Sequence, residues 1–155
     1  VLDYNSWTGL FHWKIATSKR VKIGSIAGCE RSDRYVIISI DGVRYYAHRL
    51  AWFYVYGVWV EEIDHKDTIQ NHNWINNLRD ATRSQNKGNI KKHSNNKSGI
   101  KGVSWVKSRN QWVAYIKVEK IHKNLGYFHK DDIQSAAKAY EQAAKKYFGE
   151  FARTK

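Results

Sequence analysis

The spacing of hydrophobic residues changes several times along the chain, and the first pattern predicts a β-hairpin. Apolar and polar positions in residues 35–40 and 43–46 suit two strands, and Asp41-Gly42 lies between them. An Asp-Gly pair favours the two-residue type I′ turn that joins antiparallel strands. Residues 1–46 are therefore expected to be β-rich, and Trp7, Phe11 and Trp13 are expected to lie in the core.

Residues 47–56 follow a helical period instead. Leu50, Phe53 and Tyr54 recur at the spacing that places side chains on one face of a helix. Gly57 follows directly, and glycine is the residue that most often ends a helix in the left-handed conformation. The pattern predicts a helix that packs through Leu50, Phe53 and Tyr54.

Two short strands and a helix are predicted next. The first strand ends at Asp64-His65, a loop rich in Asn and His follows, and Leu78 begins the second strand. Thr82 or Ser84 is expected to cap the helix after it, because a hydroxyl at a helix start accepts a hydrogen bond from a free backbone amide.

The last third of the chain predicts a second module. Residues 91–97 contain no apolar side chain, so residues 94–97 are expected to be a linker between a module at 1–93 and a module at 98–155. Three strand-like runs and one helix follow, at residues 99–107, 111–118, 123–128 and 131–148. Asp131 is expected to cap this helix, and Tyr147 is expected to be buried with the alanines of one helix face. Together these elements predict an α+β protein.

The charge of the chain points to a polyanionic partner. The 155 residues carry a formal net charge of +13 and include seven Trp and ten Tyr. Basic side chains release counterions from phosphates, and aromatic rings can stack on bases, so nucleic acid is the expected partner. Cys29 is the single cysteine, which excludes a disulfide and a cysteine-based zinc site. With no signal peptide or membrane-spanning run in the sequence, we expect an intracellular protein of a bacterial host cytoplasm with no membrane partner.

Four separated motifs carry the candidate chemistry. They are His48-Arg49-Leu50, Asp64-His65, Asn76-Asn77-Leu78-Arg79 and Gln85-Asn86. This order resembles the HNH, or ββα-metal, endonucleases, and in particular their phage and intron-homing branch. The sequence departs from the family in ending with Asn86 where many members have histidine. It also lacks glycine in the loop of residues 66–72.

The resemblance implies a role for each of these residues. His65 corresponds to the general base, and an imidazole titrates near neutral pH. Asn77 corresponds to the residue that orients it, while Asp64 and Asn86 correspond to ligands of one divalent cation. Oxygen ligands favour Mg²⁺ or Mn²⁺ over Zn²⁺. The expected reaction is hydrolysis of double-stranded DNA to 5′-phosphate and 3′-hydroxyl ends. His48 either contacts the phosphate of the cut strand or fixes its helix against the strand pair.

Residues 98–152 resemble the APETALA-type DNA-binding domain. The resemblance rests on Ser98-Gly-Ile-Lys-Gly-Val103, Trp112-Val-Ala-Tyr-Ile-Lys117, Leu125-Gly-Tyr-Phe128 and Ala136-Ala-Lys-Ala-Tyr140. It implies a three-stranded antiparallel sheet that contacts DNA, with one helix packed behind it. Strand alternation then turns Trp112, Ala114 and Ile116 toward the helix. The residues expected to contact DNA are His48, Arg49, Lys87, Lys91, Lys92, Lys101, Ser104, Lys107, Tyr115, Lys117, His122 and Asn124.

Alternatives remain open at this level. The chain could be a non-catalytic, sequence-preferring DNA-binding protein whose nuclease module has decayed. RNA is the less favoured nucleic acid, although charge alone does not distinguish the two polymers. His72 is a rival base or ligand, and the basic residues around 91–97 either follow the DNA backbone or form a tether. With one active site in a chain of this length, a monomer or weak dimer is expected.

Overall fold

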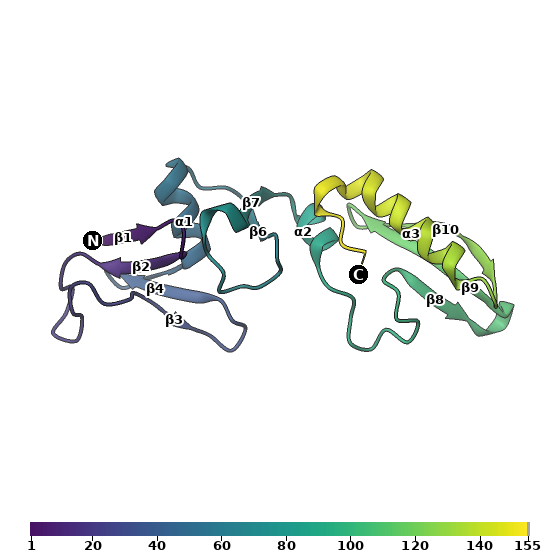
Figure 1. The fold of residues 1–155 in the computed structure, drawn as a ribbon, viewed down its shortest axis with the longest axis horizontal. Helices are drawn as coiled ribbons and strands as arrows, with labels where there is room; N and C mark the ends of the chain where they lie inside the picture. The colour runs from purple at the N-terminus through teal and green to yellow at the C-terminus, as the bar shows by residue number, and fades with distance from the viewer. Residues whose placement is uncertain (155) are drawn as a thin grey trace. The chain divides into compact units, whose positions relative to one another are not determined.

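The computed structural model describes residues 1–154 and has an α+β fold (Figure 1). It divides into two compact units, Val1–Ala81 and Thr82–Lys155. The HNH-like motif crosses this division, because Asn86 belongs to the second unit. None of the helices within residues 1–154 is both long and apolar enough to span a lipid bilayer.

The first unit begins with two small antiparallel sheets. One pairs β1 (Leu2–Asn5) with β2 (Leu10–Trp13), and the other has the order β3 (Cys29–Glu30), β4 (Val36–Ile40), β5 (Val43–Tyr46). The predicted hairpin is confirmed: β4 and β5 pair through Ile40 and Val43, and Asp41 and Gly42 have φ of 49° and 79°. Both central residues thus have the positive φ that a type I′ turn requires.

Helix α1 (Ala47–Tyr56) has the predicted bounds, and Gly57 ends it with φ of 71° and an amide bonded to the Phe53 carbonyl. The predicted packing face is wrong in part. Leu50 is buried together with Ala47 and Ala51, whereas Phe53 and Tyr54 are substantially exposed. The buried residues of α1 all lie in its first half, so burial ends before Phe53 and Tyr54.

The core of the first unit forms around Ile38, whose side chain is fully buried. Phe11 and Trp13 join it as expected. Trp7 does not: it lies in the turn between β1 and β2 and is 85% exposed. The expectation that Trp7 is a core residue is therefore wrong, because the turn directs this indole away from the sheet pair.

The central strand pair joins β6 (Glu62–His65) to β7 (Leu78–Ala81) in antiparallel register. A short 3₁₀ turn, η1 (Ile75–Asn77), ends the intervening loop immediately before β7. Thr68 in this loop has φ of 65° and donates its amide to the His65 carbonyl at 2.9 Å. A threonine thus adopts the left-handed conformation for which glycine is usual.

The second unit begins with α2 (Arg83–Asn89), capped by Thr82 rather than Ser84. The Thr82 hydroxyl accepts from the Gln85 amide, and the Gln85 side chain accepts from the Thr82 amide, which completes a capping box. Gly88 lies where a Cβ would be 2.7 Å from the Phe148 ring. The absence of a side chain at residue 88 is therefore what lets α2 pack on the C-terminal helix.

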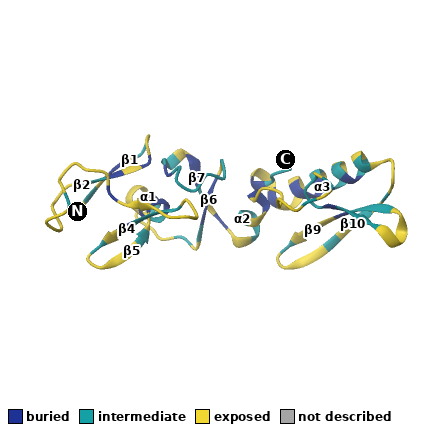
Figure 2. Cartoon of the chain, turned by 90° about the horizontal axis from the view of Figure 1, so that it is seen from below, coloured by how far each residue is buried: buried dark blue, intermediate teal, exposed yellow. Residues whose placement is uncertain are grey.

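A three-stranded antiparallel sheet completes the second unit, with one helix on one face (Figures 1 and 2). Its order is β10 (Ile121–His129), β9 (Gln111–Val118), β8 (Val103–Val106), with η2 (Lys107–Arg109) after β8. Helix α3 (Ile133–Phe148) and η3 (Gly149–Phe151) follow. Ala114 and Ile116 are buried, and Ala114 packs with Val103 of the sheet and Ala136 of the helix.

Two details of α3 differ from expectation. The cap is Asp132, whose carboxylate accepts from the Ser135 amide, and not Asp131. Phe148 is buried at the helix end, while Tyr147 is 37% exposed, because Phe148 is the residue that packs beside Gly88. The segment around residues 94–97 is held by hydrogen bonds: the Asn96 amide bonds to the His93 carbonyl, and its side chain bonds to the Ile100 carbonyl.

Candidate active site

Asp64 and His65 lie at the end of β6, and both side chains are buried. Pairing with β7 places Asp64 opposite Arg79 and His65 opposite Leu78. A buried carboxylate beside a buried imidazole is uncommon in a core that serves only stability, because both groups lose hydration. The strand end therefore carries the signature of a functional site.

Arg79 holds Asp64 through two hydrogen bonds to the same carboxylate oxygen. The Nε and Nη2 atoms lie 2.8 Å and 2.7 Å from Oδ2. Charge-assisted bonds of this kind fix the position of the carboxylate. Arg79 ends the Asn76-Asn77-Leu78-Arg79 motif, and its opposite charge across the antiparallel strand pair from Asp64 is the signal that indicates this role.

His65 is held by a residue that the sequence did not single out. Its Nε2 lies 3.1 Å from Oδ1 of Asn73, and Asn73 is 2% exposed. The rings of His48 and Tyr35 pack beside it, with centroids 5.2 Å and 6.1 Å away. Burial lowers the pKa of His65, while the bond to Asn73 and the nearby Asp67 and Asp64 raise it, and the net effect is a lowered value. His65 is therefore neutral at pH 7 and able to accept a proton.

Asn77 fixes the loop that precedes it. Its Nδ2 donates to Asp67 at 3.0 Å and to the His72 carbonyl at 2.8 Å, and its Oδ1 accepts from the Asp67 amide at 3.2 Å. Asn77 was expected to orient His65 itself. In the structure the hydrogen bonds of its side chain go to Asp67 and His72.

His72 is hydrogen-bonded to Asp67, with Nδ1 2.7 Å from Oδ2. Partial burial raises the pKa of Asp67, but the hydrogen bonds from His72, the Ile69 amide and Asn77 outweigh it and lower the value overall. His72 also packs on the ring of Trp74 at 4.5 Å. Through these contacts His72 stabilises the loop.

His48 on α1 is 8% exposed, and its Nδ1 has no hydrogen-bond partner among residues 1–154. Burial, with smaller contributions from His65 and Arg49, lowers the pKa of His48 to about 3. Arg49 donates to the carbonyls of Val60 and Glu61 and so ties α1 to the segment before β6. Arg49 thus links α1 to the segment before β6, and the His48 ring packs against the His65 ring of β6.

The residues available for a metal ion are oxygen donors. Asp64 is buried on β6, and Asn86 lies in α2 with its amide bonded to the Thr82 carbonyl. Within the described 154 residues, no group of three or more His, Cys, Asp or Glu side chains is arranged so that it could hold a metal ion. Asp64 and Asn86 belong to different units, and each offers an oxygen of the kind that a hard cation such as Mg²⁺ prefers.

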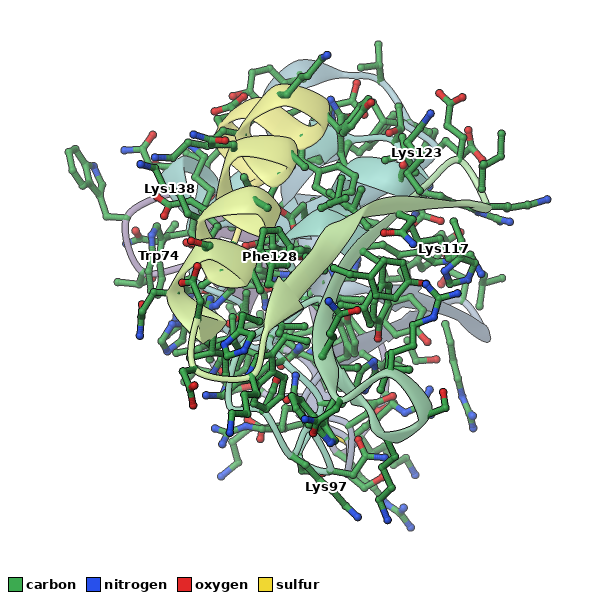
Figure 3. All side chains as sticks on the ribbon, turned by 90° about the vertical axis from the view of Figure 1, so that its right-hand side faces the viewer. Trp74, Lys97, Lys117, Lys123, Phe128 and Lys138 are labelled. Atoms are coloured by element: carbon green, nitrogen blue, oxygen red, sulfur yellow. The ribbon has the colours of Figure 1, made fainter. Side chains whose placement is uncertain are left out.

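In the second unit, five of the expected DNA-contacting residues share one face of the sheet. The register pairs Tyr115 with Asn124 and Lys117 with His122, and residues opposite each other project on the same side. Ser104 is opposite Val113 and belongs to this face as well. Figure 3 shows Phe128 beneath α3 and Lys117 away from that helix. The face turned away from α3 is therefore polar, and we call it the open sheet face.

Several of the side chains expected to contact DNA also make contacts within the protein. Asn124 accepts from the Gly126 amide at the bulge in β10. Lys101 donates to the carbonyls of Gly88 and Ile90, at 2.7 Å and 2.6 Å, and burial lowers its pKa to about 8. Lys92 donates to the Gly99 carbonyl. The exposed lysines of the set are Lys87, Lys91, Lys92, Lys107 and Lys117.

Comparison with known proteins places the middle of the chain in a defined family. Residues 45–87 match the family model described as HNH endonuclease. The chain is also 32% identical over 91 residues to Protein 3.8 of Escherichia phage T7, a similarity that covers 59% of this chain and 73% of the relative. No solved structure matches the chain. The matched residues 45–87 include His48, Asp64, His65, Asn77 and Asn86.

Proposed function

The chain belongs to the family of phage T7 Protein 3.8 and carries an HNH endonuclease domain, and from this premise we propose that it is a divalent-metal-dependent DNA endonuclease of homing type. Residues 1–93 form the nuclease module, and residues 98–155 form a DNA-reading module of APETALA type. The observation that carries the proposal is the buried pair Asp64-His65, with Arg79 holding the carboxylate and Asn73 holding the imidazole.

In the proposed reaction, the unprotonated nitrogen of His65 takes a proton from the water that attacks the phosphorus atom. Its lowered pKa keeps the imidazole neutral, and its fixed ring keeps the accepting nitrogen in one direction. Asp64 and Asn86 would hold one Mg²⁺ or Mn²⁺ ion, which supplies charge stabilisation for the phosphate and the departing oxygen. Hydrolysis leaves 5′-phosphate and 3′-hydroxyl ends.

The open sheet face is the proposed DNA-reading surface. It presents the exposed side chains of Tyr115, Lys117, His122 and Asn124, and the Tyr115 and His122 rings lie 6.2 Å apart. Beside it, Arg109 packs over the Tyr127 ring with its guanidinium carbon 4.4 Å from the ring centre. Cationic and aromatic groups on one exposed face suit phosphate contact and base stacking.

Cleavage of supercoiled plasmid tests the proposal. Wild-type protein is incubated with Mg²⁺, with Mn²⁺ or with EDTA, beside a duplex RNA substrate and an Asp64→Ala variant. We expect metal-dependent nicked or linear DNA, no cleavage in EDTA, and loss of turnover in Asp64→Ala. Phage-derived DNA is included because a homing enzyme prefers a rare site. DNA that is bound but never cut under any of these conditions would favour the non-catalytic DNA-binding alternative. Preferred cleavage of RNA would mean that RNA is the substrate instead of DNA.

A further inference from the structure

The N-terminal hairpin, formed by β1 and β2, contacts Asn73, the residue that holds His65. Tyr4 of β1 donates its hydroxyl to the backbone carbonyl of Asn73 at 2.7 Å, in a buried contact 69 residues apart in sequence. The Asn73 side chain in turn lies 3.1 Å from His65. Tyr4, Asn73 and His65 are each at most 8% exposed. A chain of buried hydrogen bonds thus runs from β1 to the imidazole.

The turn between β1 and β2 contacts the same loop through its backbone. The Ser6 carbonyl accepts from the Ile75 amide at 3.1 Å. Gly9, with φ of 74°, lies where an added Cβ would be 2.3 Å from the Trp74 nitrogen and 2.4 Å from the Asn73 carbonyl carbon. Asn5 stiffens the turn by accepting from the amides of Trp7 and Thr8. The hairpin therefore contacts residues 73–75 through the Tyr4 side chain and through the backbone of its turn.

This arrangement determines which nitrogen of His65 carries the proton. An amide oxygen only accepts hydrogen bonds, so Oδ1 of Asn73 facing Nε2 requires that Nε2 carry the hydrogen. The neutral ring then keeps its lone pair on Nδ1. Without a fixed acceptor, the ring would populate both tautomers and lose its fixed direction.

We propose that Asn73 is a positioning residue that fixes the Nδ1-basic tautomer of His65, and that residues 2–13 are the element that holds Asn73 in place. The inference rests on the proposed nuclease function. It assigns a catalytic contribution to the N-terminal hairpin, whose residues lie before the matched HNH segment. Asn73 acts through His65 and does not itself contact the substrate.

Three variants test the proposal. Asn73→Ala removes the acceptor, Asn73→Asp keeps an oxygen at the same place, and Tyr4→Phe removes only the hydroxyl while preserving the ring packed on Phe11. Each is measured for single-turnover DNA cleavage at saturating protein and for DNA affinity in EDTA. The tautomer of His65 is read at one fixed pH from the nitrogen shifts of ¹⁵N-histidine protein, assigned by comparison with His65→Gln.

We expect wild-type His65 to be the Nε2–H tautomer. Asn73→Ala should mix the tautomers and lower the single-turnover rate about 100-fold at unchanged DNA affinity, because misplacing a reacting group has costs of this order. Asn73→Asp should recover most of the rate, and Tyr4→Phe should lose about 3-fold to 10-fold.

Two results would overturn the inference: an Nδ1–H tautomer in wild-type protein, or wild-type cleavage by Asn73→Ala. The nitrogen shifts need no cleavage, so they test the positioning even if the protein cuts no DNA, which would refute the proposed function instead. If Asn73→Ala does not fold, Asn73→Asp and Tyr4→Phe carry the test, and an unaltered tautomer and rate in Tyr4→Phe would remove the role of the hairpin.

Discussion

Mild acid is expected to destabilise the first unit through His48. This side chain is 8% exposed on α1, and its pKa is lowered from 6.5 to about 3, first by burial and then by His65 and Arg49. The rings of Tyr35 and Tyr46 enclose it without offering charge. Protonating His48 in the folded protein would bury a cation beside two basic residues, whereas the unfolded chain takes up the same proton at no such cost.

The direction and size of this stability change follow from the pKa of His48 in the unfolded chain and in the folded protein. The unfolded chain binds the proton below pH 6.5 and the folded protein only near pH 3, so the stability is fully present above pH 6.5 and falls as the pH decreases. For a single group with these values, the free energy of unfolding should fall by about 2 kcal/mol between pH 7 and pH 5. His65, whose pKa is also lowered, contributes in the same direction.

The assay is urea unfolding at pH 7 and at pH 5. Unfolding is monitored by hydrogen exchange with peptide mass spectrometry, so that peptides of residues 1–81 report on the first unit separately from the second. A His48→Leu variant keeps an apolar group of similar size and removes the titrating ring. Its loss of stability between the two pH values should be smaller than that of wild type by about 2 kcal/mol. Equal losses in the two proteins would refute the assignment of the acid sensitivity to His48.

Three further perturbations separate the roles of particular residues. Trp13→Ala should cost about 3–5 kcal/mol of stability and Trp7→Ala less than about 0.5 kcal/mol, because only Trp13 is buried; equal costs in urea unfolding would contradict the described core. Gly42→Ala should lose only about 1–2 kcal/mol of stability to its positive φ, since nothing lies within 4 Å of the new Cβ. Gly9→Ala should lose more stability, because its Cβ meets the Trp74 backbone, and thermal melting compares the two variants. Lys117→Glu should weaken DNA binding and flatten its salt dependence while leaving cleavage at saturating protein intact, and unchanged affinity in a binding titration would move the reading surface elsewhere.

The features that the sequence predicted well are those that depend on local chemistry. The Asp41-Gly42 turn is confirmed because both residues tolerate positive φ, and the strands on either side pair accordingly. The end of α1 at Gly57 and the capping box of Thr82 and Gln85 are likewise properties of a few consecutive residues. The HNH endonuclease match at residues 45–87 supports the reading of the spaced motifs as a family signature.

The features that the sequence left open depend on contacts between distant segments. Asn73 stood among several loop asparagines, and only the approach of Tyr4 and His65 distinguishes it. Phe53 has the right spacing for the buried face of α1, yet the neighbouring Ala51 occupies the core instead. At the N-terminus of α3, Asp131 and Asp132 are equally suitable caps by type, and the path of the chain selects Asp132.

The central claim is that His65 removes the proton from the attacking water, and chemical rescue tests it most directly. His65→Gly leaves space beside Asn73, and added imidazole can enter that space as a free base. Cleavage of plasmid DNA in Mg²⁺ or Mn²⁺ should be lost in His65→Gly, restored in proportion to added imidazole, and unaffected in a His12→Ala control. His65→Gly that cuts as fast as wild type without imidazole would contradict the account.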